Sequence, residues 1–378
     1  RPPAEARPKH GQLVQTQTVS TIMPKRSLPG SRGSWARLAI GLGFSVLCLW
    51  LAVRDVPLDA VGQSLRQAQM GWILAAFVSV ILTNIVKTVR WRLLFYPNHR
   101  HLPRSSLFAI LMAGQAVTLA FPIRAGELVR AYLVGARFGD SKVQTLATVV
   151  VEKLLDLAML ALLILILIPL LAGSVPGLAS PIDLHALSAR QPLLWSVVVI
   201  FVLGAVLLLA QRSRLLNWSR HGAERLAGGR GTRGFAMLES ALRGLDALRY
   251  PRIALVLVMC SLAVWLMAGL TNYLVLVAVG LPASWVVSFA VLGVLQAGIV
   301  VPSSPGKVGV FQILAQWTLL WVGVDALSGL VYGIVLYVVG PLSIMIMGGL
   351  CLAWESWQLR RTVTPPRPAD AAPREVVL

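Results

Sequence analysis

The chain is short of charged residues, cysteines and histidines, and each shortage argues against a class of protein. Charged residues make up 13% of its 378 residues, against about 25% in an average soluble domain. Cys48, Cys260 and Cys351 all lie in apolar stretches, so neither a disulfide framework nor a zinc site is indicated. The five histidines are scattered without metal-binding spacing. We therefore predict no metal and no cofactor.

Long apolar runs take the place of these residues. Hydrophobic residues make up 57% of the chain, and several runs reach about 20 residues, the length that crosses a bilayer core. Closed barrels lack such runs, so the fold class is an all-α polytopic membrane protein. The net charge of +19 does not indicate nucleic acid, because the Lys and Arg residues lie mostly between the apolar runs, as the positive-inside rule describes.

Six apolar runs are predicted to cross the membrane fully. They are residues 35–53, 72–95, 143–172, 193–210, 253–279 and 326–354. The distribution of basic residues places residues 173–192 outside the cell and both termini in the cytoplasm. The terminal segments are a disordered basic tail at 1–34 and a second tail at 355–378. We expect a protein of the cytoplasmic membrane.

Two polar segments interrupt shorter apolar runs, about 180 residues apart. The first is Phe121-Pro-Ile-Arg-Ala-Gly-Glu-Leu-Val-Arg130, and the second is Val301-Pro-Ser-Ser-Pro-Gly-Lys307. In both, Gly follows Pro by four residues and a charged residue comes next. Matching Gly- and Pro-interrupted segments in two halves of a membrane protein point to a binding site.

The two halves are residues 35–172 and 193–354, each with three spans and one short hairpin. Since three is an odd number, the second half should be inverted relative to the first. We predict re-entrant hairpins at 107–135, entering from the cytoplasm, and at 284–322, entering from outside. Inverted repeats with broken helices are a plan of transporters.

Glu152 and Asp156 lie four residues apart and so share one helix face. Carboxylates within spans are rare and face the bundle interior or water. Two interpretations stay open: the pair lines a headgroup path or couples protons, or it holds the bundle together through ion pairs. The basic residues that could pair with it are Lys87, Arg90, Arg92 and Arg124.

Arg124, Glu127 and Arg130 recur at three-residue steps in the first broken segment. An Arg side chain holds phosphate in two-point geometry. We therefore predict that Arg124 or Arg130 binds a lipid phosphate, with Glu127 orienting an Arg or meeting a headgroup amine. The alternative is that these Arg residues contact bulk anionic lipid without selectivity.

Ser303, Ser304, Gly306 and Lys307 offer hydroxyls, backbone groups and a cation in the second broken segment. They predict an anion site at the start of a half-helix. The alternative is a tight outer turn from which Lys307 reaches the membrane surface. The segment does not fit the nucleotide-binding Gly-x4-Gly-Lys-Ser/Thr pattern.

Residues 211–252 carry nine Arg and no Lys, and apolar residues recur there at three- and four-residue steps. This pattern predicts an amphipathic helix lying on anionic lipid at the cytoplasmic face. A protein partner bound through this region, either an enzyme or a second copy of the chain, is the alternative.

Three motifs occur in one order: Arg124-Ala-Gly-Glu-x-x-Arg130, Glu152-Lys-Leu-Leu-Asp156 and Pro302-Ser-Ser-Pro-Gly-Lys-Val-Gly-Val-Phe311. Together they resemble the lysylphosphatidylglycerol synthase transmembrane-region family over roughly residues 35–355. The resemblance implies flippase-like lipid translocation. In full synthases a separate soluble domain makes the lysyl lipid. Only about 20 polar residues follow the last predicted span, so we expect that domain to be absent and the chain not to be an enzyme.

The chain departs from the family pattern at three positions. Lys307 stands where the family often has Gly, Gln312 where an acidic residue is common, and Lys153 where Arg is frequent. The sequence still predicts a translocator that moves or binds a phospholipid or another polar or anionic lipid. The alternatives are an intramembrane enzyme on a lipid-linked substrate, with Glu127 or Glu152 as acid or base, and a partner subunit of a lipid- or glycan-modifying enzyme.

Overall fold

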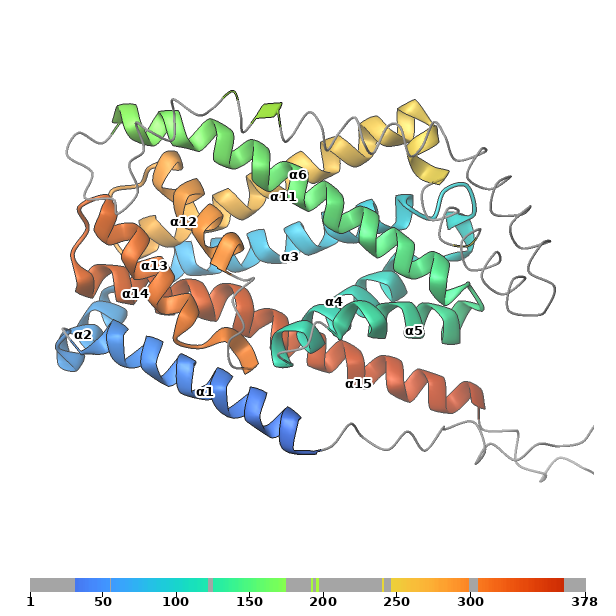
Figure 1. Cartoon of the computed structure of the whole chain (residues 1–378), viewed down its shortest axis with the longest axis horizontal. Helices are drawn as coiled ribbons and strands as arrows, with labels where there is room; N and C mark the ends of the chain where they lie inside the picture. Colours follow the sequence, from blue (N-terminus) through green and yellow to red (C-terminus); the bar gives the residue numbers. More distant parts are fainter. Residues whose placement is uncertain are drawn as a thin grey trace, which may run out of the picture. The chain divides into compact units, whose positions relative to one another are not determined.

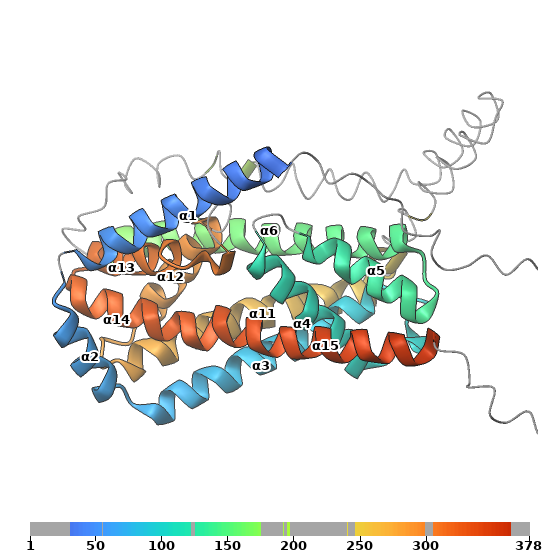
Figure 2. The same cartoon turned by 90° about the horizontal axis from the view of Figure 1, so that it is seen from below.

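The computed structural model describes residues 31–54, 56–121, 125–174, 246–298 and 305–363, together with residues 192, 195, 196 and 240. Every regular element in these ranges is helical (Figure 1; Figure 2), which agrees with the predicted all-α class. The chain divides into a short unit up to Ile40 and a large unit from Gly41 onward. The packing given below is that of the large unit.

Four helices in the described residues are long and apolar enough to cross a membrane. They are α3 (Met70–Leu93), α6 (Lys142–Ser174), α11 (Pro251–Ala278) and the continuous run of α14 (Ala326–Tyr337), η5 (Val338–Leu342) and α15 (Ser343–Val363). They match four of the six predicted spans. The predicted span 193–210 lies outside the described residues apart from two positions. The predicted span 35–53 falls in α1 (Ser31–Val53), whose described apolar part, Leu42–Val53, is shorter than a span.

Local sequence explains the ends and the bend of these helices. Pro251 opens α11 at a position where its missing N–H is not needed. The Asp325 carboxylate caps α14 by accepting from Ser328 N at 2.9 Å, and this bond lowers the pKa of Asp325. Pro341 lies inside the π-helical turn η5, where a proline removes a backbone donor and widens the helix.

Two hairpins of shorter helices interrupt the long ones. The first joins α4 (Arg104–Ala120) to α5 (Gly126–Phe138), and the second joins α12 (Trp285–Gly298) through η4 (Pro305–Lys307) to α13 (Val310–Trp321). The two arms pack on each other in both hairpins. The longest arm has 17 residues, or about 26 Å, which is less than the roughly 30 Å of a bilayer core. Re-entry from opposite faces stays a prediction.

The long helices α3, from the first half, and α11, from the second, lie side by side and antiparallel (Figure 1). Gln69 N donates to Ala278 O at 2.8 Å at one end, and Arg90 donates to Ser261 at 3.1 Å at the other. Residue numbers therefore increase along α3 in the direction in which they decrease along α11, so the two helices are antiparallel. Each hairpin also packs on the last helix of the other half, α4 on α15 and α12 on α6. This is the packing that an inverted repeat produces.

The two hairpins touch, because η4, at the break of the second hairpin, contacts α4 of the first. Close approach within the first hairpin depends on glycine. A Cβ on Gly126 would overlap the backbone oxygen of Gly114 and the hydroxyl of Thr118, so only hydrogen fits there. In the second hairpin the Tyr337 hydroxyl donates to the oxygen of Gly306 at 2.9 Å.

Several boundaries differ from the prediction. A short helix, α2 (Leu58–Gln67), occupies the connection between the first two predicted spans. Helix α15 continues to Val363 instead of ending at Trp354, because the residues after Trp354 keep good helix formers such as Glu, Gln, Leu and Arg. Helix α1 starts at Ser31, inside the predicted tail.

Other predicted segments lie largely or wholly outside the described residues. Of the region 211–252, the structure describes residue 240 and the stretch from η3 (Asp246–Arg249) into α11, so the amphipathic helix stays a prediction. The tail residues 1–30 and 364–378 and nearly all of the external loop 173–192 are likewise not described.

Candidate functional site

Four charged side chains form an ion network inside the helix bundle. Glu152 accepts from Arg130 Nη2 at 2.6 Å through Oε2, and its Oε1 lies 3.5 Å from Arg90 Nη2. Arg90 Nη1 also donates to Asp156 Oδ1 at 2.7 Å. Arg90 is fully buried, Arg130 and Glu152 are 4% and 3% exposed, and the Asp156 side chain is 27% exposed. Asp156 is therefore the member of the network that reaches the surface.

The network joins four helices. Arg90 is in the last turn of α3, Arg130 is on α5, and Glu152 with Asp156 lies on one face of α6. Ser261 of α11 accepts from Arg90 at 3.1 Å. Because both Arg residues share Glu152, the first hairpin is tied electrostatically to two long helices.

Trp91 holds Arg130 from a second side. The Arg130 guanidinium carbon lies 4.0 Å from the centre of the Trp91 ring, a distance at which the ring face attracts a cation. The indole N–H of Trp91 donates to Thr148 Oγ1 at 3.2 Å, which fixes the ring. The aliphatic part of Arg130 packs on Gly114 of α4, where any larger residue would displace it.

The network has hydrogen-bonding capacity left over. The Nε atoms of Arg90 and Arg130 are buried and have no partner among the described residues, and the same is true of Glu127 Oε2. Buried polar atoms are normally paired with protein groups or ordered water. Two guanidinium donors without acceptors fit an anionic oxygen, and the guanidinium fork suits phosphate and carboxylate groups.

A line of polar side chains leads from the network towards the first hairpin. Lys87 lies one turn before Arg90 on α3, half-buried, within electrostatic range of Asp156 and Glu152. One turn further back, Asn84 accepts from Gln115 Nε2 of α4 at 2.9 Å. Since Gln115 lies in the second half of α4, the line ends close to the break of that hairpin.

The ion-pairing interpretation of Glu152 and Asp156 describes the observed geometry. Of the four predicted basic partners, Arg90 bonds both carboxylates. Arg92 instead donates to the backbone oxygen of Leu102 at 2.8 Å. Arg130 was not among the expected partners, yet it forms the shorter bond to Glu152. Ion pairing does not exclude a role in binding, so that role stays a prediction.

The first broken segment is only partly described. Arg130 is buried in the bundle and so does not contact bulk lipid in this conformation. Glu127 lies in the first turn of α5, at the end of the helix where backbone N–H groups favour negative charge. Arg124 lies outside the described residues, and its predicted contact with phosphate is untested.

The second broken segment turns through left-handed backbone. Gly306, Lys307 and Gly309 have φ values of 77°, 57° and 84°, a region that favours glycine. At position 307 this geometry would suit glycine better than lysine. The Gln312 side chain accepts from Gly309 N at 2.7 Å and caps α13. Ser303 and Ser304 lie outside the described residues, so the predicted anion site there stays a prediction.

One buried carboxylate was missed by the sequence reasoning. Glu355 of α15 is 1% exposed and pairs with Arg137 of α5. It directly follows Trp354, where the last span was predicted to end. The available signal was a single carboxylate, Glu355, at the edge of an apolar run. Such residues are rarely left unpaired, so a basic partner could have been expected. This pair ties the far end of the first hairpin to the second half.

The four long apolar helices, the two hairpins and the buried ion network together define a polytopic α-helical membrane protein. Residues 38–348 match the model of the lysylphosphatidylglycerol synthase TM region, and the chain belongs to that family. The resemblance inferred from the three motifs is thus confirmed.

One curated relative is Glycosyltransferase AglD of Haloferax volcanii, which is 27% identical over 328 residues. The match covers 80% of this chain and 50% of AglD, so the chain spans about half the length of this relative. No solved structure matches the chain significantly.

Proposed function

We propose that the protein binds the polar or anionic headgroup of a membrane lipid beside its ion network and moves that lipid between the leaflets of the cytoplasmic membrane. The observation that carries this proposal is the buried network itself. It includes Arg130 of the first hairpin, the Nε donors of Arg90 and Arg130 have no partner among the described residues, and the hairpin touches the second broken segment.

The physical argument concerns the cost of moving a headgroup through hydrocarbon. An ionised group without partners is very costly to bury. The polar line through Lys87, Asn84 and Gln115 offers partners along the way. At its end Glu152 and Asp156 neutralise the two Arg residues, and a lipid phosphate can take over one of these ion pairs. Exchange of one anion for another keeps the buried charges paired throughout.

The test is a leaflet-exchange assay with the purified full chain in liposomes. A fluorescent phosphatidylglycerol is placed in both leaflets, and a membrane-impermeant quencher reports how much label changes sides. We compare wild type with Glu127→Gln, because Glu127 has a buried oxygen without a described partner. The matched control is Leu128→Ala, since Leu128 is the exposed neighbour on α5.

We expect wild type and Leu128→Ala to exchange the label and Glu127→Gln to slow it about tenfold, the effect of roughly 1.4 kcal/mol on a barrier. If Glu127→Gln exchanges lipid at the wild-type rate, the protein is still a translocator, but Glu127 does not contact the moving lipid. No exchange by wild type with several headgroups would reject translocation.

The name of the glycosyltransferase relative favours a second candidate, in which the chain handles a lipid-linked glycan as an enzyme or as its partner. Incubation with a lipid-linked sugar would then give a new product, visible by chromatography, where translocation changes only its leaflet. A partner bound through 211–252 would be lost in Arg249→Glu with Arg252→Glu, because the Arg249 side chain is 61% exposed. A complex that survives both substitutions would count against that surface.

A further inference from the structure

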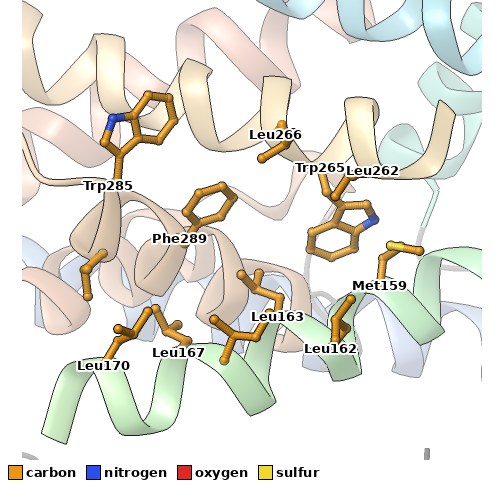
Figure 3. A pocket seen from close by; sticks show the side chains of 12 residues that line it. Met159, Leu162, Leu163, Leu167, Leu170, Leu262, Trp265, Leu266, Trp285 and Phe289 are labelled. Atoms are coloured by element: carbon orange, nitrogen blue, oxygen red, sulfur yellow. The ribbon is translucent and has the colours of Figure 1, made fainter. Parts of the chain in front are cut away.

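We propose that an apolar groove next to the ion network holds an acyl chain of the lipid, with the lipid phosphate at the network. This inference rests on the proposed lipid-binding function. The groove, called the acyl groove below, has a volume of 330 Å³ and lies between α6, α11 and α12 (Figure 3). Its lining includes Met159, Leu163, Leu167, Trp265, Leu266 and Phe289.

The chemistry of the lining selects hydrocarbon. Every lining side chain is aliphatic, aromatic or a methionine. Leu163 and Leu167 of α6 lie across from Phe289, with Trp265 further along (Figure 3). Ile166 and Leu266 line the groove and are each 50% exposed, so the groove opens to the surface of the helix bundle. A flexible apolar chain can therefore enter from the side.

The groove continues directly from the ion network. Glu152, Asp156, Met159, Leu163 and Leu170 follow one another on α6 at steps of four, three, four and seven residues, which puts them on one helix face. Asp156, the exposed member of the network, is three residues from Met159, or about 4.5 Å along the helix axis. One stripe of α6 is thus charged at one end and apolar along the rest, as an amphiphilic ligand requires.

The same continuity occurs on the facing helix. Ser261 of α11 accepts a hydrogen bond from Arg90 of the network at 3.1 Å, and Trp265, four residues further along the same helix face, lines the acyl groove. The network and the groove therefore share two helices.

The surroundings of the network favour an anion. The two Arg and two carboxylate charges of the network cancel, and two further cations, Lys87 and Lys153, lie within electrostatic range of Glu152. This excess of positive charge suits the negative charge of a lipid phosphodiester.

The length of the groove fits one leaflet. Met159 and Leu170 are eleven residues apart on α6, or about 16 Å. This is about half of a hydrocarbon core of roughly 30 Å. An acyl chain attached to a headgroup at the network would therefore span the groove and end near the middle of the bilayer.

The predicted span 193–210 follows α6 in sequence and is the main rival occupant of the groove. The positions of the crosslinks in the experiment below distinguish this segment from an acyl chain.

Photo-crosslinking of the purified full chain in liposomes tests the proposal. The probe is phosphatidylglycerol with a diazirine in the middle of one acyl chain, and peptide mass spectrometry locates the adducts. We expect adducts on α6 between residues 159 and 170 and on α11 at 262–266. Ile166→Trp and Leu266→Trp, which fill the groove, should each lower them about tenfold, equivalent to roughly 1.4 kcal/mol of binding.

The matched control is Leu157→Trp, which adds the same bulk to α6 at an exposed position that does not line the groove. It should label like wild type. Leu266→Ala enlarges the groove without adding bulk and should retain labelling. The Leu266→Ala variant still tests the proposal if gel filtration and thermal unfolding show that the Trp variants do not fold. Loss of labelling in Leu266→Ala together with wild-type folding would overturn the proposal.

Two further outcomes would overturn it. Adducts spread evenly over lipid-facing helices, unaffected by the filled groove, would show ordinary annular lipid. Adducts confined to 193–210 would show that this segment covers the groove. The leaflet-exchange assay on the same samples separates this proposal from the proposed function. Groove labelling without leaflet exchange would support the acyl groove and reject translocation. Leaflet exchange without groove labelling would support translocation and reject the acyl groove.

Discussion

Arg130 and Glu152 form a 2.6 Å ion pair in the interior of the bundle, between the first hairpin and α6. Arg90 approaches the second oxygen of the same carboxylate. Glu152 thus contacts both buried guanidinium groups, and Arg90 has Asp156 as a second partner at 2.7 Å. Removing one partner of a buried ion pair leaves a charge without compensation, which costs far more than the pair contributes. The geometry makes Glu152 the residue whose loss should be felt most.

We expect Glu152→Gln to destabilise the protein by about 3–5 kcal/mol. The change keeps the shape of the side chain and removes the charge that Arg90 and Arg130 share. Thermal unfolding in detergent measures the effect. Asp156→Asn is the matched control, and its effect should be smaller because the Asp156 side chain is 27% exposed and water screens its charge.

The same variant tests phosphate binding. If a lipid phosphate can replace the Glu152 carboxylate, added phosphatidylglycerol should raise the unfolding temperature of Glu152→Gln more than that of wild type. Phosphatidylcholine, whose phosphate is neutralised by its own cation, serves as the control lipid. Equal stabilisation of both proteins by both lipids would contradict a phosphate site at the network.

Gly126→Ala should destabilise the first hairpin by about 1–3 kcal/mol, the usual cost of overpacking. The new methyl group would overlap the Gly114 backbone oxygen and Thr118, which forces α4 and α5 apart and disturbs Arg130. Gly349→Ala in α15 is the control, because nothing lies within 4 Å of its added methyl group. If the two substitutions have equal effects on thermal unfolding, close approach of the hairpin arms is not required.

Lys307→Gly should stabilise the protein by roughly 1 kcal/mol, because Lys307 has a φ of 57° and left-handed backbone is costly for residues with a Cβ. Lys307→Asn is the matched variant: Asn tolerates this conformation but, like Gly, lacks the charge. Unfolding temperature and lipid exchange are measured together. If both variants exchange lipid more slowly while their stability is unchanged or higher, the charge of Lys307 takes part in lipid movement. Lower stability in both would show that the contacts of Lys307 outweigh its backbone strain.

Cysteine accessibility checks the inverted topology. In a chain whose three native cysteines are replaced by Ala, Ala125→Cys should react with an impermeant thiol reagent from the cytoplasm and Pro305→Cys from outside. The two breaks enter from opposite faces if the halves are inverted. Reaction of both positions from one side would contradict re-entry from opposite faces.

Local sequence was sufficient for the long helices and the two hairpins that the structure describes. Apolar runs such as that of α11 fix where long helices form, because length and composition are local properties. The breaks at Gly126 and Gly306 were equally visible, since Pro and Gly act on their own backbone. Charge pairing was only partly predictable. The sequence offered Lys87, Arg90, Arg92 and Arg124 as partners at similar depths and gave no means of ranking them.

The sequence by itself therefore determined that this is a helical membrane protein with two broken hairpins and acidic residues inside a span. Only the tertiary structure decided that Arg130 meets Glu152, that Glu355 is buried against Arg137, and that the acyl groove adjoins the ion network. The physical reason is that these contacts depend on how each helix is rotated and which helix it packs against. Those choices come from side-chain packing between distant segments, and no local pattern records them.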